Sequence, residues 1–320
     1  MKPPRPAPTG AADEASERFL RELAQRARAL GLDAAPRLDV ACSGGLDSTV
    51  LLHALAQLAR AWGCALRAHH VRHHLRDDAA DAACARAQAE ALGVPFVLSE
   101  LDPPAALGPQ GGLEAWARDA RYAALVRAAE AADVGVLLTA QHGDDALEGH
   151  LLRLLRGSGL EGAGMAESRW LSDRVRLARP LLGMGRAEMA AYAQAQGLAY
   201  VHDPSNDERQ RARNALRLEL VQPWLEALAP GARRTLYASL ARLRSDACAL
   251  DALAGEAVAH GVLTSERGWY LSLAQARALG RPATAQLLRH AARTLVPGHV
   301  PGARQVERAL DGSFGEPQRP

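Results

Sequence analysis

The stretch from Val40 to Leu52 combines the residue types that bind phosphate groups. A short apolar run leads into the string Ser-Gly-Gly-Leu-Asp-Ser at residues 43–48 and then into a helical pattern. This order predicts a strand, a tight turn and a helix start. Backbone N–H groups at a helix start form an anion site, and glycine lets a phosphate approach the backbone. Two glycines alone would fit an ordinary capped turn, but the full string favours nucleotide binding.

A Walker-type phosphate loop is excluded, because that motif requires a lysine and Lys2 is the only lysine in the chain. The same count leaves no catalytic lysine in the body of the protein. Almost all of the positive charge is therefore arginine, whose planar guanidinium group can bind a phosphate through two parallel hydrogen bonds.

Length and composition limit the class of protein. The 320 residues suffice for about two domains, and a hydrophobic content of 48% supports real cores. A net charge of +2 means that any nucleic-acid surface must be local. Cys42, Cys64, Cys84 and Cys248 are scattered, which argues against a metal-binding cysteine pair and a disulfide framework. Because no segment resembles a signal peptide or a membrane span, we expect a cytoplasmic protein without membrane contact.

Strand and helix patterns alternate through the first half of the chain. Strands are predicted at residues 37–42, 65–71, 94–98 and 134–140, and helices at 16–30, 48–62, 77–92, 113–132 and 144–155. Beyond them we expect an edge strand at 175–178, helices at 186–196 and 211–221, and a short strand at 269–273. The alternation predicts an α/β fold with a parallel, doubly wound, Rossmann-like sheet that binds ligands at the carboxyl ends of its strands.

Proline and glycine mark a domain boundary near Pro223. Residues 1–222 are expected to form the catalytic domain, with a disordered segment at 1–15. Residues 223–320 are expected to form a helical C-terminal domain.

Two clusters of polar residues follow predicted strands. Four histidines lie between residues 69 and 74. Metal binding is the weaker interpretation, because metal sites usually add cysteine or carboxylate ligands at fixed spacing. We expect His73 to face the nucleotide or RNA. In the string Thr-Ala-Gln-His-Gly-Asp-Asp at 139–145, acids open a helix, and Asp145 and Glu148 share one helix face that could hold a cation or an amine.

Two further clusters are weak signals by themselves. The helix face that carries Glu114, Arg118 and Arg121 fits a solvated, salt-bridged surface. The arginine-rich stretch at residues 203–217 fits either a solvated face or a phosphate contact.

In order and spacing, these strings together resemble the tRNA(Ile)-lysidine synthase family of PP-loop ATP pyrophosphatases. The matching strings are Ser-Gly-Gly-Leu-Asp-Ser at 43–48, His-Val-Arg-His-His-Leu-Arg at 70–76, Glu-x-x-Ala-Arg-x-x-Arg-Tyr at 114–122, Thr-Ala-Gln-His-x-Asp-Asp-x-x-Glu at 139–148, Leu-Leu-Arg-Leu-Leu-Arg-Gly-Ser-Gly at 151–159, Arg-Pro-Leu-Leu at 179–182, and Asp-Pro-Ser-Asn at 203–206 with Arg213-Asn214. Arg72, Gln141 and Gly149 depart from the family's usual Asn, His and Thr.

The resemblance implies ATP-dependent ligation of free L-lysine to C2 of the wobble cytidine, C34, of a tRNA(Ile) with a CAU anticodon. ATP first adenylates the C2 carbonyl oxygen and pyrophosphate is released, and the lysine amine then displaces AMP. An amine with a pKa of about 10.4 must lose a proton before it attacks, so carboxylates beside it are expected. The domain at 223–320 would bind tRNA or substrate. The oligomeric state stays open, with a homodimer as one option.

The resemblance also implies a role for each matching residue. The residues expected to bind ATP are Ser43, Gly44, Gly45, Leu46, Asp47 and Ser48, with Asp47 also a ligand of Mg²⁺. Arg121 and Arg213 are expected to stabilise charge on phosphate or on the adenylated base, and Asp145 and Glu148 to bind and help deprotonate lysine. The residues expected to contact tRNA are His73, Arg76, His142, Arg153, Arg156, Asn214 and Arg217.

Two alternatives share parts of this pattern. Another PP-loop tRNA-modifying enzyme, of the 2-thiocytidine type, would have the same loop, but sulfur transfer normally needs paired cysteines, which this chain lacks. A non-catalytic tRNA-binding relative would keep the fold, and only the departures at Gln141 and Gly149 favour it.

Overall fold

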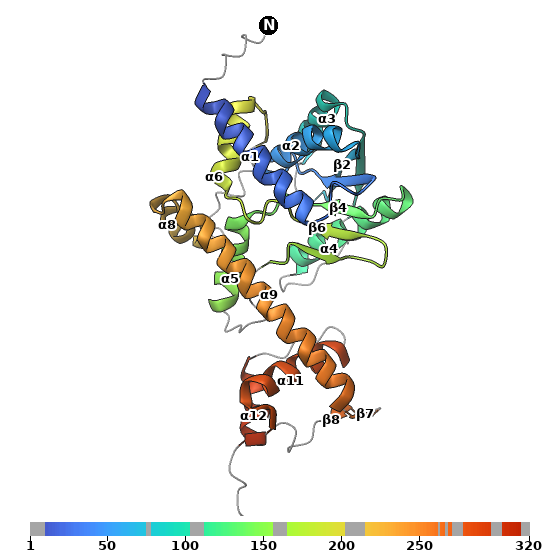
Figure 1. Cartoon of the computed structure of the whole chain (residues 1–320). Coiled ribbons are helices and arrows are strands. Elements are labelled where there is room, and N and C mark those ends of the chain that lie inside the picture. Colours follow the sequence, from blue (N-terminus) through green and yellow to red (C-terminus); the bar gives the residue numbers. More distant parts are fainter. Residues whose placement is uncertain are drawn as a thin grey trace, which may run out of the picture. The chain divides into compact units, whose positions relative to one another are not determined.

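The computed structural model describes residues 10–74, 78–102, 112–155, 165–201, 215–261, 263–265, 268–270, 278–295 and 303–314 (Figure 1). Its elements, in chain order, are α1 (Gly10–Ala29), β1 (Arg37–Ala41), α2 (Leu46–Trp62), β2 (Ala65–Arg72), α3 (Ala79–Leu92), β3 (Phe96–Glu100), α4 (Gly112–Ala131), β4 (Val136–Leu138), α5 (Gly143–Leu155), β5 (Ser168–Trp170), β6 (Arg176–Ala178), α6 (Arg186–Gln196), the π-helix η3 (Leu216–Val221), α8 (Gln222–Ala227), α9 (Pro230–Gly261), β7 (Leu263–Ser265), β8 (Gly268–Tyr270), α11 (Arg281–Leu295) and α12 (Ala303–Phe314).

Contacts within the chain cluster into two compact units. The first comprises residues 1–148 and 166–237, and the second comprises residues 149–165 and 238–320. The division therefore falls inside the helices α5 and α9, whereas the sequence suggested a boundary near Pro223, which lies within α8. The assignment of residues 1–222 to catalysis and of residues 223–320 to tRNA binding stays a prediction.

The first unit is built on a six-stranded sheet in the order β3-β2-β1-β4-β6-β5. Val40 of β1 pairs with Ala68 of β2 on one side and with Leu138 of β4 on the other, both in parallel register. The predicted parallel, doubly wound sheet is thus confirmed. Because successive strands run outward in opposite directions from β1 and β4, the loops that follow these two strands border a crevice suited to a ligand.

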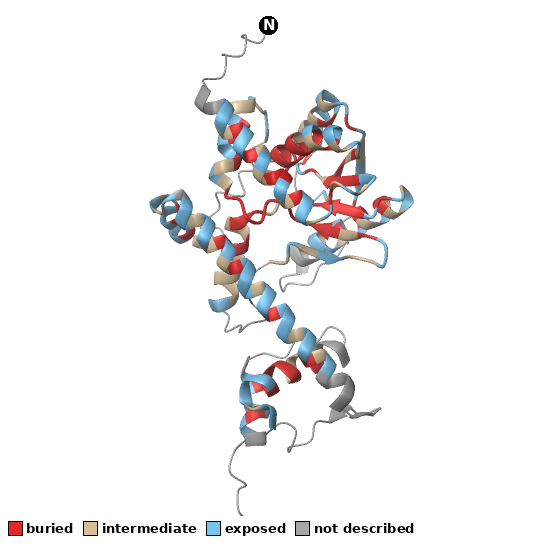
Figure 2. Cartoon of the chain, in the orientation of Figure 1, coloured by how far each residue is buried: buried red, intermediate tan, exposed pale blue. Residues whose placement is uncertain are grey.

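Helices cover both faces of this sheet, and Figure 2 shows buried residues concentrated along its strands. One core joins Leu23 of α1, Leu51 of α2 and Tyr192 of α6 to the sheet residue Val40. The other core packs Leu125 of α4 against the sheet. Both cores are built mainly from Ala, Leu and Val, as a chain with only 4% aromatic residues requires.

Three expectations about single elements need correction or lie partly outside the described residues. The helix α1 begins at Gly10, so residues 10–15 are helical rather than disordered, and their alanines explain the extension. The strand β6 is not the edge, because the short strand β5 pairs with it antiparallel and occupies the edge. Of the helix expected at 211–221, residues 216–221 are π-helical and 211–214 lie outside the described residues.

The second unit is mostly helical. It contains most of α9, the hairpin of β7 and β8, and the helices α11 and α12, which pack through Ala285, Val306 and Leu310. Residues 269–270 of the short strand expected at 269–273 belong to β8, and residues 271–273 lie outside the described residues. Across the described parts of both units, none of the helices is long and apolar enough to cross a membrane.

A buried ion pair ties the centre of the sheet together. Asp39 of β1 is fully buried, and the guanidinium of Arg67 on β2 donates to it from Nε at 2.8 Å and from a terminal nitrogen at 2.5 Å. The same terminal nitrogen also donates to the backbone carbonyl of Ala128 on α4. Arg67 therefore joins two strands and a helix.

We predict that Arg67→Ala lowers the free energy of unfolding by about 3–5 kcal/mol, because it leaves the Asp39 carboxylate buried without its partner. Urea denaturation of the variant and the wild type measures this loss. Arg60→Ala is the matched control, since its guanidinium makes an exposed hydrogen bond to the Leu92 carbonyl and its removal should cost less than about 1 kcal/mol. Equal losses in the two variants would contradict the prediction.

Candidate active site

The loop after β1 has a backbone that only glycine fits at one point. Gly44 has a φ of +83°, in the left-handed region, and a Cβ atom there would lie 2.6 Å from the backbone oxygen of Asp81. The next residue, Gly45, precedes α2 and offers no side chain to cap it. The N–H groups at the start of α2 are consequently available to an anion.

The two serines of the loop hold it in shape. The backbone N–H of Ser43 donates to the Ser48 hydroxyl at 3.1 Å, and the two hydroxyl oxygens lie 3.0 Å apart. The Ser48 hydroxyl also donates to the Gly45 carbonyl at 3.1 Å. Ser43 is exposed whereas Ser48 is buried, so Ser43 can meet a ligand and Ser48 supports the turn.

Neighbouring elements brace the loop from two sides. His70 of β2 places Nδ1 2.6 Å from the carbonyl oxygen of Cys42, which explains why this histidine is buried. The backbone N–H of Val201 donates to the Gly44 carbonyl at 2.9 Å. This hydrogen bond joins the loop to the residue that follows α6 and its short extension.

The loop after β4 meets the loop after β1 at His142. The Nε2 atom of this buried histidine lies 3.7 Å from Oδ2 of Asp47 and 3.5 Å from Oδ2 of Asp145. The backbone N–H of His142 also donates to Oδ2 of Asp145 at 3.1 Å. Two carboxylates that are 98 residues apart therefore share one imidazole nitrogen, because β1 and β4 are adjacent in the sheet.

The acids around His142 raise its pKa, so that it is positively charged at neutral pH. Burial alone would lower the pKa of His142, but the charge of Asp145, the hydrogen bond and charge of Asp47 and the charge of Asp144 outweigh burial and raise it from 6.5 to about 9. For Asp47, burial favours the neutral form, yet His142, Arg186 and Arg217 together hold the pKa of its carboxyl below 3.8. At neutral pH the centre of the site thus holds an imidazolium beside the ionised carboxylate of Asp47.

Asp144 has a supporting role that differs from that of Asp145. Its Oδ2 accepts the backbone N–H of Arg186 at 3.1 Å, and its Oδ1 accepts the hydroxyl of Tyr237 in a short hydrogen bond. Tyr237 is buried, and its ring packs so closely on Gly143 that a Cβ there would overlap it. The start of α5, which carries Asp145 and Glu148, is therefore held by α6 and by the first turns of α9.

Arg121 belongs to a separate cluster of guanidinium groups around Tyr122. The guanidinium carbons of Arg118, Arg121 and Arg169 lie 5.8, 6.0 and 5.5 Å from the centre of the Tyr122 ring. Burial alone would raise the pKa of the Tyr122 phenol. A hydrogen bond to Gln141 and the charges of neighbouring arginines outweigh burial and lower this pKa.

Gln141 links this arginine cluster to the loop after β4. Its Oε1 accepts the Thr139 hydroxyl at 2.6 Å and Nε of the buried Arg179 at 2.7 Å. Gln141, one of the residues that depart from the family pattern, thus joins Thr139 and Arg179 next to His142.

Several other predicted site residues are placed by the structure. Glu148 is buried on α5, one turn after Asp145. The positive charge of Arg217 on η3 helps lower the pKa of Asp47. His73 follows β2, and its backbone N–H donates to Asp78 at 3.2 Å. Arg153 belongs to the second unit. Arg76, Arg156, Arg213 and Asn214 lie outside the described residues.

The sequence did not identify Arg186 and Tyr237 as parts of the site. Arg186 opens α6, and Tyr237 belongs to a stretch that the sequence assigned to the other domain. Both residues contact Asp144, which is more than 40 residues away from each of them in the sequence. A local sequence pattern cannot predict such contacts.

We predict a pH-dependent contribution of His142 to stability. Its pKa is higher in the folded protein than the value near 6.5 of an unfolded chain, so the contribution is complete below pH 6.5 and is lost as the pH rises through 9. The wild type should therefore lose on the order of 3 kcal/mol relative to His142→Gln between pH 6 and pH 10, measured by urea denaturation at several pH values. Parallel pH profiles, or an NMR titration of this imidazole centred near 6.5, would contradict the prediction.

Comparisons with known proteins agree with this geometry. The sequence model of the PP-loop domain matches residues 13–224. The chain is 46% identical over 234 residues to a tRNA(Ile)-lysidine synthase of Pseudomonas fluorescens, 48% over 225 residues to one of Pseudomonas aeruginosa, and 42% over 262 residues to one of Burkholderia mallei. The alignments cover 72%, 65% and 76% of this chain but 51%, 49% and 52% of the relatives. The chain thus spans about half the length of these relatives.

Among solved structures, the U34-tRNA thiolase of Methanococcus maripaludis, determined with its [4Fe-4S] cluster, superposes with a TM-score of 0.56. The superposition covers 72% of this chain and 80% of the thiolase at 19% sequence identity, so it shows a shared fold alone. The motif resemblance to lysidine synthases is confirmed as similarity over the part of the chain that aligns. With a glycine-shaped anion loop after β1, an acidic helix start after β4 and a domain match over residues 13–224, the chain belongs to the PP-loop family.

Proposed function

We propose that this chain ligates L-lysine to C2 of the wobble cytidine C34 of a tRNA(Ile) with a CAU anticodon. PP-loop membership implies the use of ATP. In the proposed reaction, the C2 carbonyl oxygen attacks the α-phosphate of ATP, and pyrophosphate leaves. The ε-amine of lysine then attacks C2, loses a proton, and AMP leaves with the former carbonyl oxygen. The protein acts in the cytoplasm, and a homodimer is one option for its assembly.

The observation that carries this proposal is the meeting of Asp47 and Asp145 at Nε2 of His142. It brings the phosphate-binding loop and the acidic start of α5 to one crevice, as a reaction with an activation step and an amine-transfer step requires. A phosphate site alone would fit any ATP-cleaving enzyme. The adjacent acids add a place for a cationic amine.

The residues divide between the two steps. The loop from Ser43 to Ser48 binds the phosphates that leave as pyrophosphate through the N–H groups at the start of α2, and Leu46 anchors the helix start in the core. Asp145 and the buried Glu148 attract the ammonium group of lysine and accept its proton. Arg121 and Arg213 neutralise charge on the phosphate or the adenylated base, and His73, Arg76, Arg153, Arg156, Asn214 and Arg217 face the tRNA. His142, which the sequence also assigned to the tRNA, is buried between Asp47 and Asp145 and holds these two acids instead.

The residues present fit a magnesium ion at Asp47. Its Oδ1 is buried and has no hydrogen-bond partner among the described residues, and a carboxylate oxygen is the ligand that this hard cation prefers. When bound, Mg²⁺ supplies charge neutralisation for the phosphates of ATP. The low pKa of Asp47 keeps the carboxylate ionised for that role.

Sulfur transfer is the weaker alternative. Cys42 is buried, and burial raises the pKa of its thiol to about 12, which removes the reactive thiolate at neutral pH. Cys64, Cys84 and Cys248 are unpaired as disulfides and come from three different helices or loops. A non-catalytic role is also weaker, because the acids of both steps are present.

The proposal predicts that radiolabelled lysine enters a tRNA(Ile) transcript with a CAU anticodon only when ATP and Mg²⁺ are present. Asp47→Ala should reduce pyrophosphate release by at least about 100-fold, since it removes a charge from the activation step. The exposed Asp173→Ala is its control and should keep nearly full activity. Absence of label in the tRNA at saturating ATP and lysine would overturn the function.

We further predict that Glu148→Gln separates the two steps. Pyrophosphate release should fall by less than about tenfold, whereas lysine incorporation should fall by about 100-fold or more, because the amide neither attracts an ammonium nor accepts its proton. Glu90→Gln, an exposed change on α3, is the control. Equal losses of the two activities in Glu148→Gln would contradict a role confined to lysine.

A further inference from the structure

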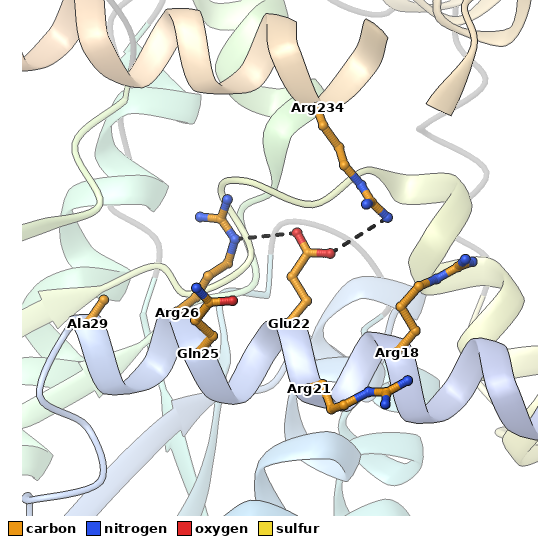
Figure 3. A pocket seen from close by; sticks show the side chains of 7 residues that line it. All are labelled: Arg18, Arg21, Glu22, Gln25, Arg26, Ala29 and Arg234. Carbon is orange, nitrogen blue, oxygen red and sulfur yellow. Dashed lines mark ion pairs between the residues drawn. The ribbon is translucent and has the colours of Figure 1, made fainter. Parts of the chain in front are cut away.

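A hollow of about 530 Å³ lies along α1, outside the candidate site, and is dominated by arginine. Figure 3 shows it between the side of α1 and the start of α9. Its charged lining residues are Arg18, Arg21, Glu22, Arg26 and Arg234. All five belong to the first unit.

Glu22 is the one acid in this lining, and two arginines share it. Its carboxylate lies 3.7 Å from Nε of Arg26 and 3.8 Å from a terminal nitrogen of Arg234, as the dashed lines of Figure 3 mark. Arg26 also contacts Glu167 at 3.4 Å, and Arg234 contacts Glu188 at 3.2 Å. These ion pairs therefore fix the positions of Arg26 and Arg234 in the lining of the hollow.

The other two arginines bring charge that is not cancelled. Arg18 and Arg21 are exposed, and neither takes part in an ion pair within the part of the chain that the structure describes. Glu22 is already shared by Arg26 and Arg234, so it does not neutralise them. The hollow consequently carries an excess of positive charge on a protein whose net charge is only +2.

The hollow adjoins the candidate site through the starts of α6 and α9. Arg234 lies one helical turn before Tyr237, whose hydroxyl binds Asp144. Its partner Glu188 accepts the backbone N–H of Gly185 at 2.9 Å, and a Cβ on Gly185 would lie 3.1 Å from the Tyr237 hydroxyl. These contacts connect the lining of the hollow to the residues that hold the start of α5.

We propose that this hollow binds the sugar–phosphate backbone of the RNA whose base enters the candidate site. The inference rests on the proposed function for the identity of the RNA. Guanidinium groups bind phosphate oxygens through paired hydrogen bonds, and each such contact releases counterions that had condensed on the nucleic acid. In the proposed function the loop at residues 43–48 takes the phosphates of ATP, so a second surface for phosphates on the same unit suits a polymer.

The test is a charge reversal on α1 in the full chain. Arg18→Glu/Arg21→Glu should weaken binding of a tRNA(Ile) transcript with a CAU anticodon by about tenfold or more, measured by filter binding. The slope of log affinity against log salt should decrease by about 1.5 to 2. Arg18→Gln/Arg21→Gln should give a smaller loss in the same direction. The KM for ATP should not change.

Arg28→Glu is the matched control, because Arg28 is an exposed arginine of the same helix that pairs with Asp33 and does not line the hollow. Equal affinities of Arg28→Glu and the double variant would overturn the inference, as would an absence of tRNA binding by the wild type. The inference would also be overturned if the double variant lost binding of polyglutamate but kept binding of tRNA. The hollow would then serve an acidic peptide. The readout is binding rather than catalysis, so a wild type that binds tRNA through α1 but incorporates no lysine would disprove the proposed function alone.

Discussion

The arrangement of the site depends on one electrostatic constraint, which is the positive charge of His142 between Asp47 and Asp145. Two carboxylates that face the same crevice repel each other, and burial makes that repulsion stronger. An imidazolium within 4 Å of both offsets the repulsion, and it helps hold the pKa of Asp47 below its ordinary value. The sheet order makes this contact, because β1 and β4 are neighbours and their following loops open on the same side. The order of the strands thus determines the contact with His142 on which the charges of the site depend.

Much of this fold follows from local patterns that the sequence displays. Alternating apolar strands and helices predict the parallel sheet, and the Ser-Gly-Gly string predicts the anion loop, since both signals lie within about ten residues. Asp47 and Asp145 were also predictable, because each follows a strand of the same sheet. Their meeting at His142 was not, since residue spacing does not state which strands are adjacent.

The remaining features depend on contacts that are remote in the sequence. Tyr237 reaches Asp144 from a helix that begins at Pro230, and a tyrosine on a helix more often packs in a core than holds an acid. The edge strand β5 has three residues, too few for any periodicity to identify it. Gly44 was recognised as a turn residue, but the reason that no other residue fits is the Asp81 carbonyl, which lies on α3.

The near-neutral net charge conceals a separation of charge within the first unit. Acids gather at the start of α5, where Asp144, Asp145 and Glu148 follow one another within five residues. Guanidinium groups gather elsewhere in the first unit, around Tyr122 and along α1. Local field rather than total charge decides where an ion goes, since exposed charges are screened within about 10 Å. A cation is therefore attracted to α5 and an anion to the arginines, which is the separation that the proposed reaction of a cationic amine with a polyanion would need.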